Sequence, residues 1–256
     1  MDGDDKQLKF ENKGGPLLSH VRLYLIYWGS YWKQEGKLMS DVTVSIGSMV
    51  DGDYLSQLAQ YNVPDGQPFE VRLAGTVTDY ESGPPNPFSD SEKKGGPSDV
   101  RNEIMRLIDG DKLGPPSDGT SQALYMVIMP KGVTCSTADD DGEDGDGQHF
   151  YFVHNGQQVY YGWSRSGASD SALERITSTL SEEIVEAITD PEPGKGWVAS
   201  ATGEEVEVCD VCQGVNLRVD GVLVRAYYSN RVQDCVAGKA APLRVGELAK
   251  PAVAQG

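Results

Sequence analysis

The fold of this chain is decided by one stretch, Ser169 to Trp197, which reads SDSALERITSTLSEEIVEAITDPEPGKGW. Ser171 and Glu174 have the spacing of a capping box, and good helix formers follow them. The helix is predicted to end at Asp190, because Pro191 cannot continue it. The stretch therefore predicts one complete helix with a signal at each end.

This helix is predicted to have two unlike faces when its residues are turned by about 100° each. The apolar face comprises Leu173, Ile176, Leu180, Ile184, Ala187 and Ile188. The acidic face comprises Glu182, Glu183, Glu186 and Asp190. Carboxylates four residues apart destabilise a helix slightly, so local stability gives no reason to place them one turn apart. A bound cation would offset that repulsion, although an acidic face on an acidic protein is ordinarily just solvated.

Composition bounds the class of protein. The 256 residues can form one large domain or two small ones, and the 38% hydrophobic and 24% charged residues are ordinary for a globular chain. The net charge of -17 repels phosphate backbones and anionic membranes, so we expect no nucleic-acid partner. No apolar run is long enough to span a bilayer, so membrane insertion is not expected either. Metal cations or basic partners suit this charge better.

Cysteines and the N-terminus bear on the compartment. The first ten residues, MDGDDKQLKF, are unlike a signal peptide, so the chain is expected to be either cytosolic or an exported form without its leader. Four cysteines favour export. Cys209 and Cys212 form a lone C-x-x-C with no second pair or nearby histidine, which argues against a zinc knuckle and favours structural disulfides.

The remaining chain alternates strands and helices. Strands are predicted over Leu17–Trp32, Phe69–Thr78 and Ala123–Met129, helices over 40–50, 54–61 and Ser98–Ile108, and a hairpin over 149–163 around Asn155-Gly156. A second short hairpin is predicted across Asp220-Gly221. Residues 1–15 are predicted to be a mobile leader and 237–256 a loose tail, leaving a core of 16–197 with an extension over 198–236.

This order of elements resembles the N-terminal half of a zinc-peptidase (zincin) domain. The resemblance implies an α/β fold in which a mixed sheet with an antiparallel edge strand and hairpin precedes the metal-type helix. A small disulfide-bonded β subdomain would follow at the C-terminal end.

Three separated stretches together resemble the phosphate-induced, Exordium-like secreted proteins and their microbial relatives. They are GGPLL (14–18) followed by LIYWGSYW (25–32), SEEIVEAITDP (181–191) followed by Gly196-Trp197, and EVCDVC (207–212) followed by Tyr228 and Cys235. The resemblance covers most of the chain from Gly14 to about Val236. It implies a helix of the pattern S-H-E-L-x-E-A-x-T-D-P.

The chain departs from that pattern at the position of the metal-binding histidine. Glu182 stands where the pattern has its histidine, whereas Glu183 and Glu186 agree with it. In a zincin-type site the histidine is a metal ligand and the next glutamate, here Glu183, polarises the attacking water. An all-oxygen set of Glu182, Glu186 and Asp190 would suit calcium, magnesium or manganese better than zinc. We therefore expect a divalent cation, calcium before zinc, and weak or absent hydrolysis.

Two further stretches are candidates for cation binding. His149 lies where the family carries a histidine, and is either an extra ligand or a structural residue that begins a strand. The loop DDDGEDGDG over Asp139–Gly147 offers Asp139, Asp141, Asp144 and Asp146. Its spacing is not that of an EF-hand, so it is either a second cation site or a solvated loop.

The resemblance also implies a disulfide between Cys212 and Cys235. We expect Cys209 to pair with Cys135, which would leave no thiol unpaired; a Cys209–Cys212 bridge is the alternative.

The leading functional hypothesis is an exported zincin-like protein with a degenerate metal site that binds cations and a protein or peptide ligand. The alternative is an active metallopeptidase with Glu183 as general base. A third class, a glycan-binding module, would use aromatic residues. They are Trp28, Tyr31, Trp32, Trp163 and Trp197.

Overall fold

The computed structural model describes residues 8–62, 69–91, 96, 98–136, 146–166, 171–201 and 204–238. Their centre is a five-stranded sheet of order β3-β2-β4-β6-β5. The parallel strands are β2 (His20–Trp28), β3 (Glu70–Asp79), β4 (Gln122–Ile128) and β6 (Gln157–Ser164), and β5 (Gly147–His154) is the antiparallel edge strand. The predicted mixed sheet with an antiparallel edge strand is therefore confirmed.

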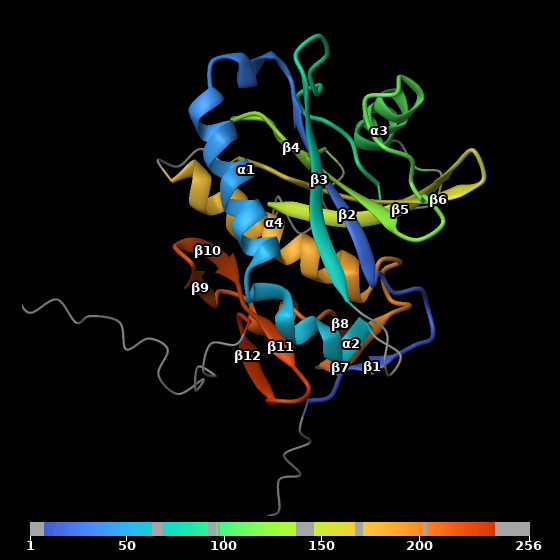
Figure 1. Cartoon of the computed structure of the whole chain (residues 1–256), viewed down its shortest axis with the longest axis vertical. Helices are drawn as coiled ribbons and strands as arrows, with labels where there is room; N and C mark the ends of the chain where they lie inside the picture. The colour runs from blue at the N-terminus through green and yellow to red at the C-terminus, as the bar shows by residue number, and fades with distance from the viewer. Residues whose placement is uncertain are drawn as a thin grey trace, which may run out of the picture.

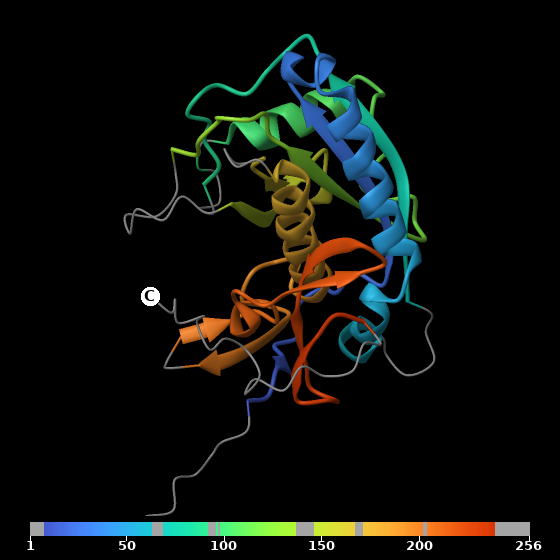
Figure 2. The ribbon, with the colours of Figure 1, turned by 90° about the vertical axis from the view of Figure 1, so that its left-hand side faces the viewer.

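Helices cover both faces of this sheet (Figures 1 and 2). The helices α1 (Gly36–Asp51) and α4 (Ala172–Thr189) pack on one face, and α3 (Asp99–Asp109) packs on the other. The central strand β4 is buried from Ala123 to Ile128, as its uninterrupted apolar run predicts. Alternate side chains of each strand thus contribute to two separate hydrophobic clusters.

Several local signals act as predicted. Ser98 caps α3 by accepting a hydrogen bond from the Arg101 backbone N–H at 3.0 Å. Asn155 and Gly156 have positive φ angles of 49° and 77°, so they form the tight turn that joins β5 to β6. The predicted helix at 54–61 is instead a 3-10 turn, η2 (Tyr54–Leu58), that runs into a short helix, α2 (Ala59–Asn62).

The helix α4 ends where the sequence predicts, but its beginning differs. Ser171 occupies the N-cap position without a side-chain capping hydrogen bond, and Glu174 pairs with Arg218 instead of returning to the backbone. The predicted capping box is therefore absent, and the glutamate contacts the neighbouring hairpin. The helix is also enclosed on nearly all sides: β5 and β6 lie on one flank, and α1 and a C-terminal hairpin lie on the other (Figure 1).

The C-terminal part packs below the sheet as three small antiparallel units (Figure 1). The first joins β1 (Glu11–Asn12), β7 (Trp197–Ala201) and β8 (Glu204–Val206). A 3-10 turn, η3 (Asp210–Cys212), leads to the hairpin of β9 (Asn216–Val219) and β10 (Val222–Arg225), which turns at Asp220-Gly221 as predicted. The last unit pairs β11 (Tyr227–Ser229) with β12 (Asp234–Val236).

The N-terminal residues are integrated in this part. Phe10 is fully buried, and residues 11–12 pair with β7, so residues 8–15 of the predicted leader belong to the folded domain. Residues 1–7 and 239–256 lie outside the described residues, although Ala237 at the start of the predicted tail is buried.

The disulfide between Cys212 and Cys235 is present, with an S–S distance of 2.06 Å, and is consistent with the expected export. The predicted pairing of Cys135 with Cys209 is wrong. These two residues form no disulfide, because they lie in separate hydrophobic clusters on opposite faces of the sheet. Within the described ranges, no helix combines the length and apolarity needed to cross a bilayer.

Candidate metal centre

The acidic residues of α4 meet β5 and the segment that follows β8. Glu186 comes from the helix, His149 from the edge strand and Glu207 from the segment between β8 and η3. One ligand atom from each lies within 4.8 Å of those of the other two. This metal triad, His149, Glu186 and Glu207, could hold a metal ion.

The imidazole of His149 is the centre of the group. Its Nδ1 lies 3.5 Å from Glu183 Oε2 and 3.8 Å from Glu186 Oε2. Its Nε2 lies 3.4 Å from Glu207 Oε1 and 3.1 Å from the backbone carbonyl oxygen of Asp190. The ring is 4% exposed, and the side chains of Glu183 and Glu186 are 8% and 7% exposed, so the contacts are almost fully desolvated.

A glycine allows the edge strand to approach the helix this closely. A Cβ on Gly147 would lie 2.4 Å from Thr179 Cγ2 and 2.7 Å from Glu183 Oε1. Real Cβ atoms do not tolerate such distances, so any side chain at this position would push β5 away from α4. Gly147, the last glycine of the acidic loop, is therefore needed for the packing of β5 on α4.

Two carboxylate oxygens of the triad fit a cation. Glu186 Oε1 is buried and accepts no hydrogen bond from the described residues. Glu207 Oε1 is also buried and accepts none from them, and its contact with His149 is an ion pair at 3.4 Å. A buried acceptor without a donor costs about 1–3 kcal/mol, and more when it is charged. A metal ion would satisfy both oxygens.

Burial and mutual repulsion change the acidity of these groups. Burial raises the pKa of Glu183 to about 7. Burial, followed by repulsion from Glu207 and Glu183, raises the pKa of Glu186 well above its ordinary value. Burial would lower the pKa of His149, but the surrounding carboxylates outweigh it and raise that pKa well above its ordinary value. The metal-free group therefore holds protons at neutral pH that a cation would displace.

The triad borders a cavity of about 590 Å³. Its lining is strongly polar, and six carboxylates and two guanidinium groups face it. These are Asp146, Glu182, Glu183, Glu186, Glu207, Asp210, Arg175 and Arg225. The cavity can admit a ligand several atoms across beside the triad.

Glu182, a predicted ligand, is not part of the triad. Its Oε2 lies 3.0 Å from Arg225 Nη2 and 3.1 Å from Arg225 Nε, so the carboxylate is engaged by β10. Helix geometry explains the difference. Glu183 and Glu186 are three residues apart and share a flank, whereas Glu182 is turned by about 100° toward the hairpin.

Asp190 contributes its backbone to the site, and its carboxylate serves the loop that follows. Its two side-chain oxygens accept hydrogen bonds from the backbone N–H groups of Gly194, Lys195 and Gly196, at 2.7, 3.1 and 2.5 Å. Of the predicted ligands Glu182, Glu186, Asp190 and His149, only Glu186 and His149 belong to the triad, and Glu207 completes it.

The acidic loop is described only at its end. Asp139, Asp141 and Asp144 lie outside the described residues. Asp146 Oδ1 pairs with Arg165 at 3.3 Å and also with Arg175. Its carboxylate is already matched by two guanidinium groups.

Glu207 is the residue that sequence reasoning missed. It opens the EVCDVC segment that carries part of the family resemblance, but nothing in its spacing to α4 marks it as a ligand. Its backbone N–H donates to Asp210 Oδ2 at 2.7 Å, which fixes the turn into η3 and places the glutamate over the triad.

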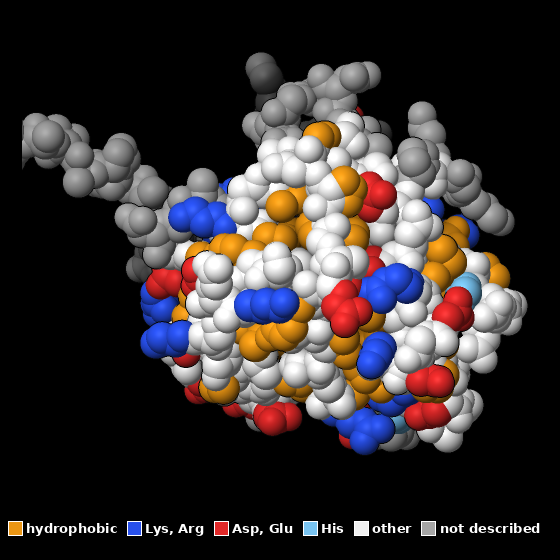
Figure 3. Space-filling model, turned by 90° about the horizontal axis from the view of Figure 1, so that it is seen from above, with side chains coloured by type: hydrophobic (Ala, Val, Ile, Leu, Met, Phe, Trp, Pro, Cys, Tyr) orange, Lys and Arg blue, Asp and Glu red, His pale blue; other side chains and the backbone are white. Residues whose placement is uncertain are grey.

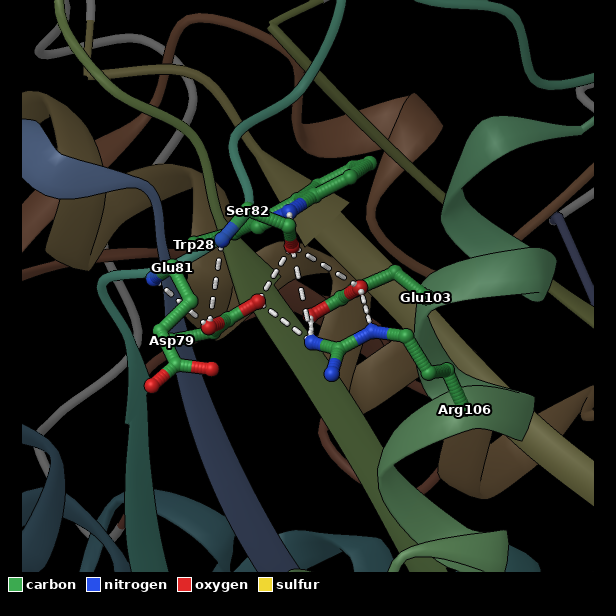
Figure 4. Close-up of polar contacts among 6 residues, drawn as sticks. All are labelled: Trp28, Asp79, Glu81, Ser82, Glu103 and Arg106. Atoms are coloured by element: carbon green, nitrogen blue, oxygen red, sulfur yellow. Dashed lines mark hydrogen bonds and ion pairs between the residues drawn. The ribbon is translucent and has the colours of Figure 1, made fainter.

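A second buried acidic cluster lies at the ends of β2 and β3 (Figure 4). Arg106 contacts Glu103 through two nitrogens, at 3.0 and 2.8 Å, and also pairs with Asp79. Ser82 links Asp79 to Trp28, whose indole N–H donates to the serine at 3.1 Å. Both carboxylates have donors within the cluster, so it joins α3 to the sheet and offers no ligand site.

No protein-family model matches this chain, and no curated protein matches it in sequence.

The aromatic residues of the third hypothesis are mostly core. Trp28, Trp32 and Trp163 are 4%, 0% and 2% exposed. Tyr31 and Trp197 are partly buried and pack against the hydrophobic cluster that contains Trp32. They form no exposed stacking platform of the kind that a sugar ring needs.

Proposed function

We propose that this protein is a metal-dependent hydrolase in which the metal triad holds a divalent ion and Glu183 is the general base. The observation that carries the proposal is the convergence of three ligand-type side chains with a fourth side chain, the buried carboxylate of Glu183, in one cavity. Three protein ligands leave coordination positions for water and substrate, as in catalytic zinc sites.

The imidazole changes the metal that we expect. Without a histidine on α4, the helix alone favours calcium, which takes oxygen ligands. His149 supplies a nitrogen donor from β5, and a set of one imidazole and two carboxylates suits zinc, manganese or iron. We therefore propose a transition metal, with zinc as the first candidate.

The side chains can then share the work. When bound, a divalent ion lowers the pKa of a water molecule and polarises a carbonyl group. Glu183 lies next to the triad, where it can accept a proton from that water and return it to a leaving group. In the metal-free protein, burial raises its pKa to about 7. Arg175 and Arg225 line the same cavity, where they pair with Asp146 and Glu182 and hold these two carboxylates in its wall.

The resemblance to zincins supports a peptide substrate. The mixed sheet, its antiparallel edge strand and the following helix agree with the architecture that the resemblance implies. On this basis we extend the proposal to an exported metallopeptidase related to the Exordium-like proteins.

A second candidate function is cation-dependent binding without catalysis. It is favoured by Glu182, because this residue replaces the family's histidine and is paired with Arg225. In that case the triad would be a structural site that stabilises the junction of α4, β5 and the C-terminal part.

Metal analysis and cleavage assays separate the two candidates. The purified protein is expected to contain about one transition-metal ion per chain and to cleave unstructured peptides in a chelator-sensitive way. Glu183→Gln should retain the metal and lose roughly 100- to 10,000-fold of the activity. Glu174→Gln, on the exposed start of the same helix, is the matched control and should keep full activity. Stoichiometric metal without cleavage would favour the binding function, and no metal would reject both.

A further inference from the structure

We infer that Asp190 is a positioning residue. Its backbone carbonyl accepts a hydrogen bond from His149 Nε2 and so holds the ring in the tautomer whose lone pair is on Nδ1, the nitrogen that faces the carboxylates of α4. The inference rests on the proposed function, since it concerns the orientation of a metal ligand. It also assigns a role to a residue that sequence reasoning had treated as a ligand.

The hydrogen bond from the histidine ring determines the tautomer. A backbone carbonyl can only accept, so the 3.1 Å contact between His149 Nε2 and Asp190 O requires a hydrogen on Nε2. Glu207 Oε1, 3.4 Å from Nε2, faces the same hydrogen and favours the same tautomer. In the neutral ring the lone pair is then on Nδ1, which lies 3.5 Å from Glu183 and 3.8 Å from Glu186. Metal-binding histidines commonly donate a hydrogen bond from their other ring N–H group to such a carbonyl.

The carboxylate of Asp190 holds this carbonyl in place. The Asp190 side chain is fully buried and accepts three backbone N–H groups from residues 194–196, while its own N–H donates to Glu186 O at 2.6 Å. The loop also packs closely on the end of α4: a Cβ on Gly196 would lie 2.3 Å from Thr189 O and 2.7 Å from Asp190 Cα, so only glycine fits at this position. These contacts hold the Asp190 backbone next to His149.

The segment that follows β1 forms backbone hydrogen bonds with the loop after Asp190. Lys13 N–H donates to Gly196 O at 2.8 Å, and Gly15 N–H donates to Lys195 O at 2.7 Å. A Cβ on Gly15 would lie 2.5 Å from Lys195 O, so only glycine allows this approach. The GGPLL stretch thus supports the turn that orients His149.

Two measurements test the inference. Zinc affinity, measured by competition with a chromophoric chelator, should fall 10- to 100-fold in Asp190→Asn, because an amide cannot accept from three donors with both of its atoms. Lys195→Ala, which removes an exposed ion pair of the same loop, is the control and should change affinity less than about 2-fold. Equal affinity of Asp190→Asn and wild type would overturn the inference.

The second measurement needs no variant and no metal. Nitrogen-15 NMR of the metal-free wild-type protein, at a pH high enough for a neutral ring, should show His149 with its hydrogen on Nε2. The opposite tautomer would overturn the inference even if Asp190→Asn fails to fold. If wild type binds no zinc but shows the Nε2–H tautomer, the proposed function fails and the positioning role of Asp190 stands.

Discussion

At the scale of single residues, four carboxylates on one helix have four different environments. Glu182 is neutralised by an arginine, Glu183 and Glu186 are buried beside a histidine, and Asp190 is saturated by backbone N–H groups. Their identical chemistry therefore leads to one structural ion pair, one candidate base, one candidate ligand and one positioning residue. The difference arises from the direction in which each side chain leaves the helix and from what it meets there.

The stability of the metal-free protein should fall as the pH rises from about 5 to 8. Glu183 has a folded pKa of about 7, above its ordinary value of 4.5, so the folded state binds more protons in this range than the unfolded state. The raised pKa of His149 acts in the same direction above its ordinary value of 6.5. Urea denaturation at several pH values, in the presence of chelator, measures the slope.

Metal and mutation should both alter this slope. Saturating zinc should reduce or reverse it, because metal binding requires the deprotonated ligands and strengthens with pH. Glu183→Gln should flatten the glutamate part of the slope between about pH 5 and 7. A metal-free protein that becomes more stable across this range would contradict the prediction.

At the scale of elements, two contacts outside the site hold the layers together. Arg106 joins α3 to the end of β3 through Glu103 and Asp79, whose side chains are only 3% and 7% exposed (Figure 4). The disulfide joins η3 to β12 and closes the C-terminal part. Each contact links segments that are distant in sequence, so each is a specific test of the packing.

Arg106→Ala should destabilise the fold by about 1–3 kcal/mol, because two nearly buried carboxylates lose their common cation. The half-exposed position of the guanidinium keeps the effect below that of a fully buried pair. Lys37→Ala, which removes an exposed pair with Asp41, is the matched control and should cost less than about 0.5 kcal/mol. Equal effects in thermal or urea unfolding would show that the cluster is not structural.

Replacing Cys212 and Cys235 together by alanine should cost about 3 kcal/mol, since the disulfide spans 23 residues. Cys135→Ala breaks no disulfide and serves as the reference for the loss of a buried sulfur. Equilibrium unfolding of both variants provides the comparison. The assigned role of the disulfide fails if the double variant is no less stable than the reference.

At the scale of the whole molecule, the distribution of charge predicts the kind of ligand that the site attracts. The net charge is -17, yet basic and acidic side chains are interspersed on the face seen from above (Figure 3). The cavity beside the triad has six carboxylates, and both of its arginines are engaged by two of them, Glu182 and Asp146. The molecule should therefore attract cationic ligands toward the site.

Cationic peptides should be bound or cleaved better than anionic peptides of equal length. The preference should weaken when the salt concentration rises from about 0.05 to 0.5 M, because the Debye length over which charges attract shortens from about 14 Å to about 4 Å. A matched pair of lysine-rich and glutamate-rich peptides, assayed at several salt concentrations with metal present, measures this. A salt-independent preference for the acidic peptide would contradict it.

The sequence by itself determined the regular elements. The apolar run of β4, the Asn155-Gly156 turn, the Ser98 cap and the end of α4 before Pro191 all depend on neighbours within a few residues. Periodicity and turn chemistry act over that range, so these elements could be predicted.

The tertiary structure alone decided which side chains form the site. His149, Glu186 and Glu207 belong to three elements, and their meeting depends on how β5 packs on α4 and how the C-terminal part folds over both. The same long-range packing removed Glu182 and the carboxylate of Asp190 from the site and separated Cys135 from Cys209. Such contacts are set by the register of the strands and the docking of the layers, and no local pattern in the chain specifies either.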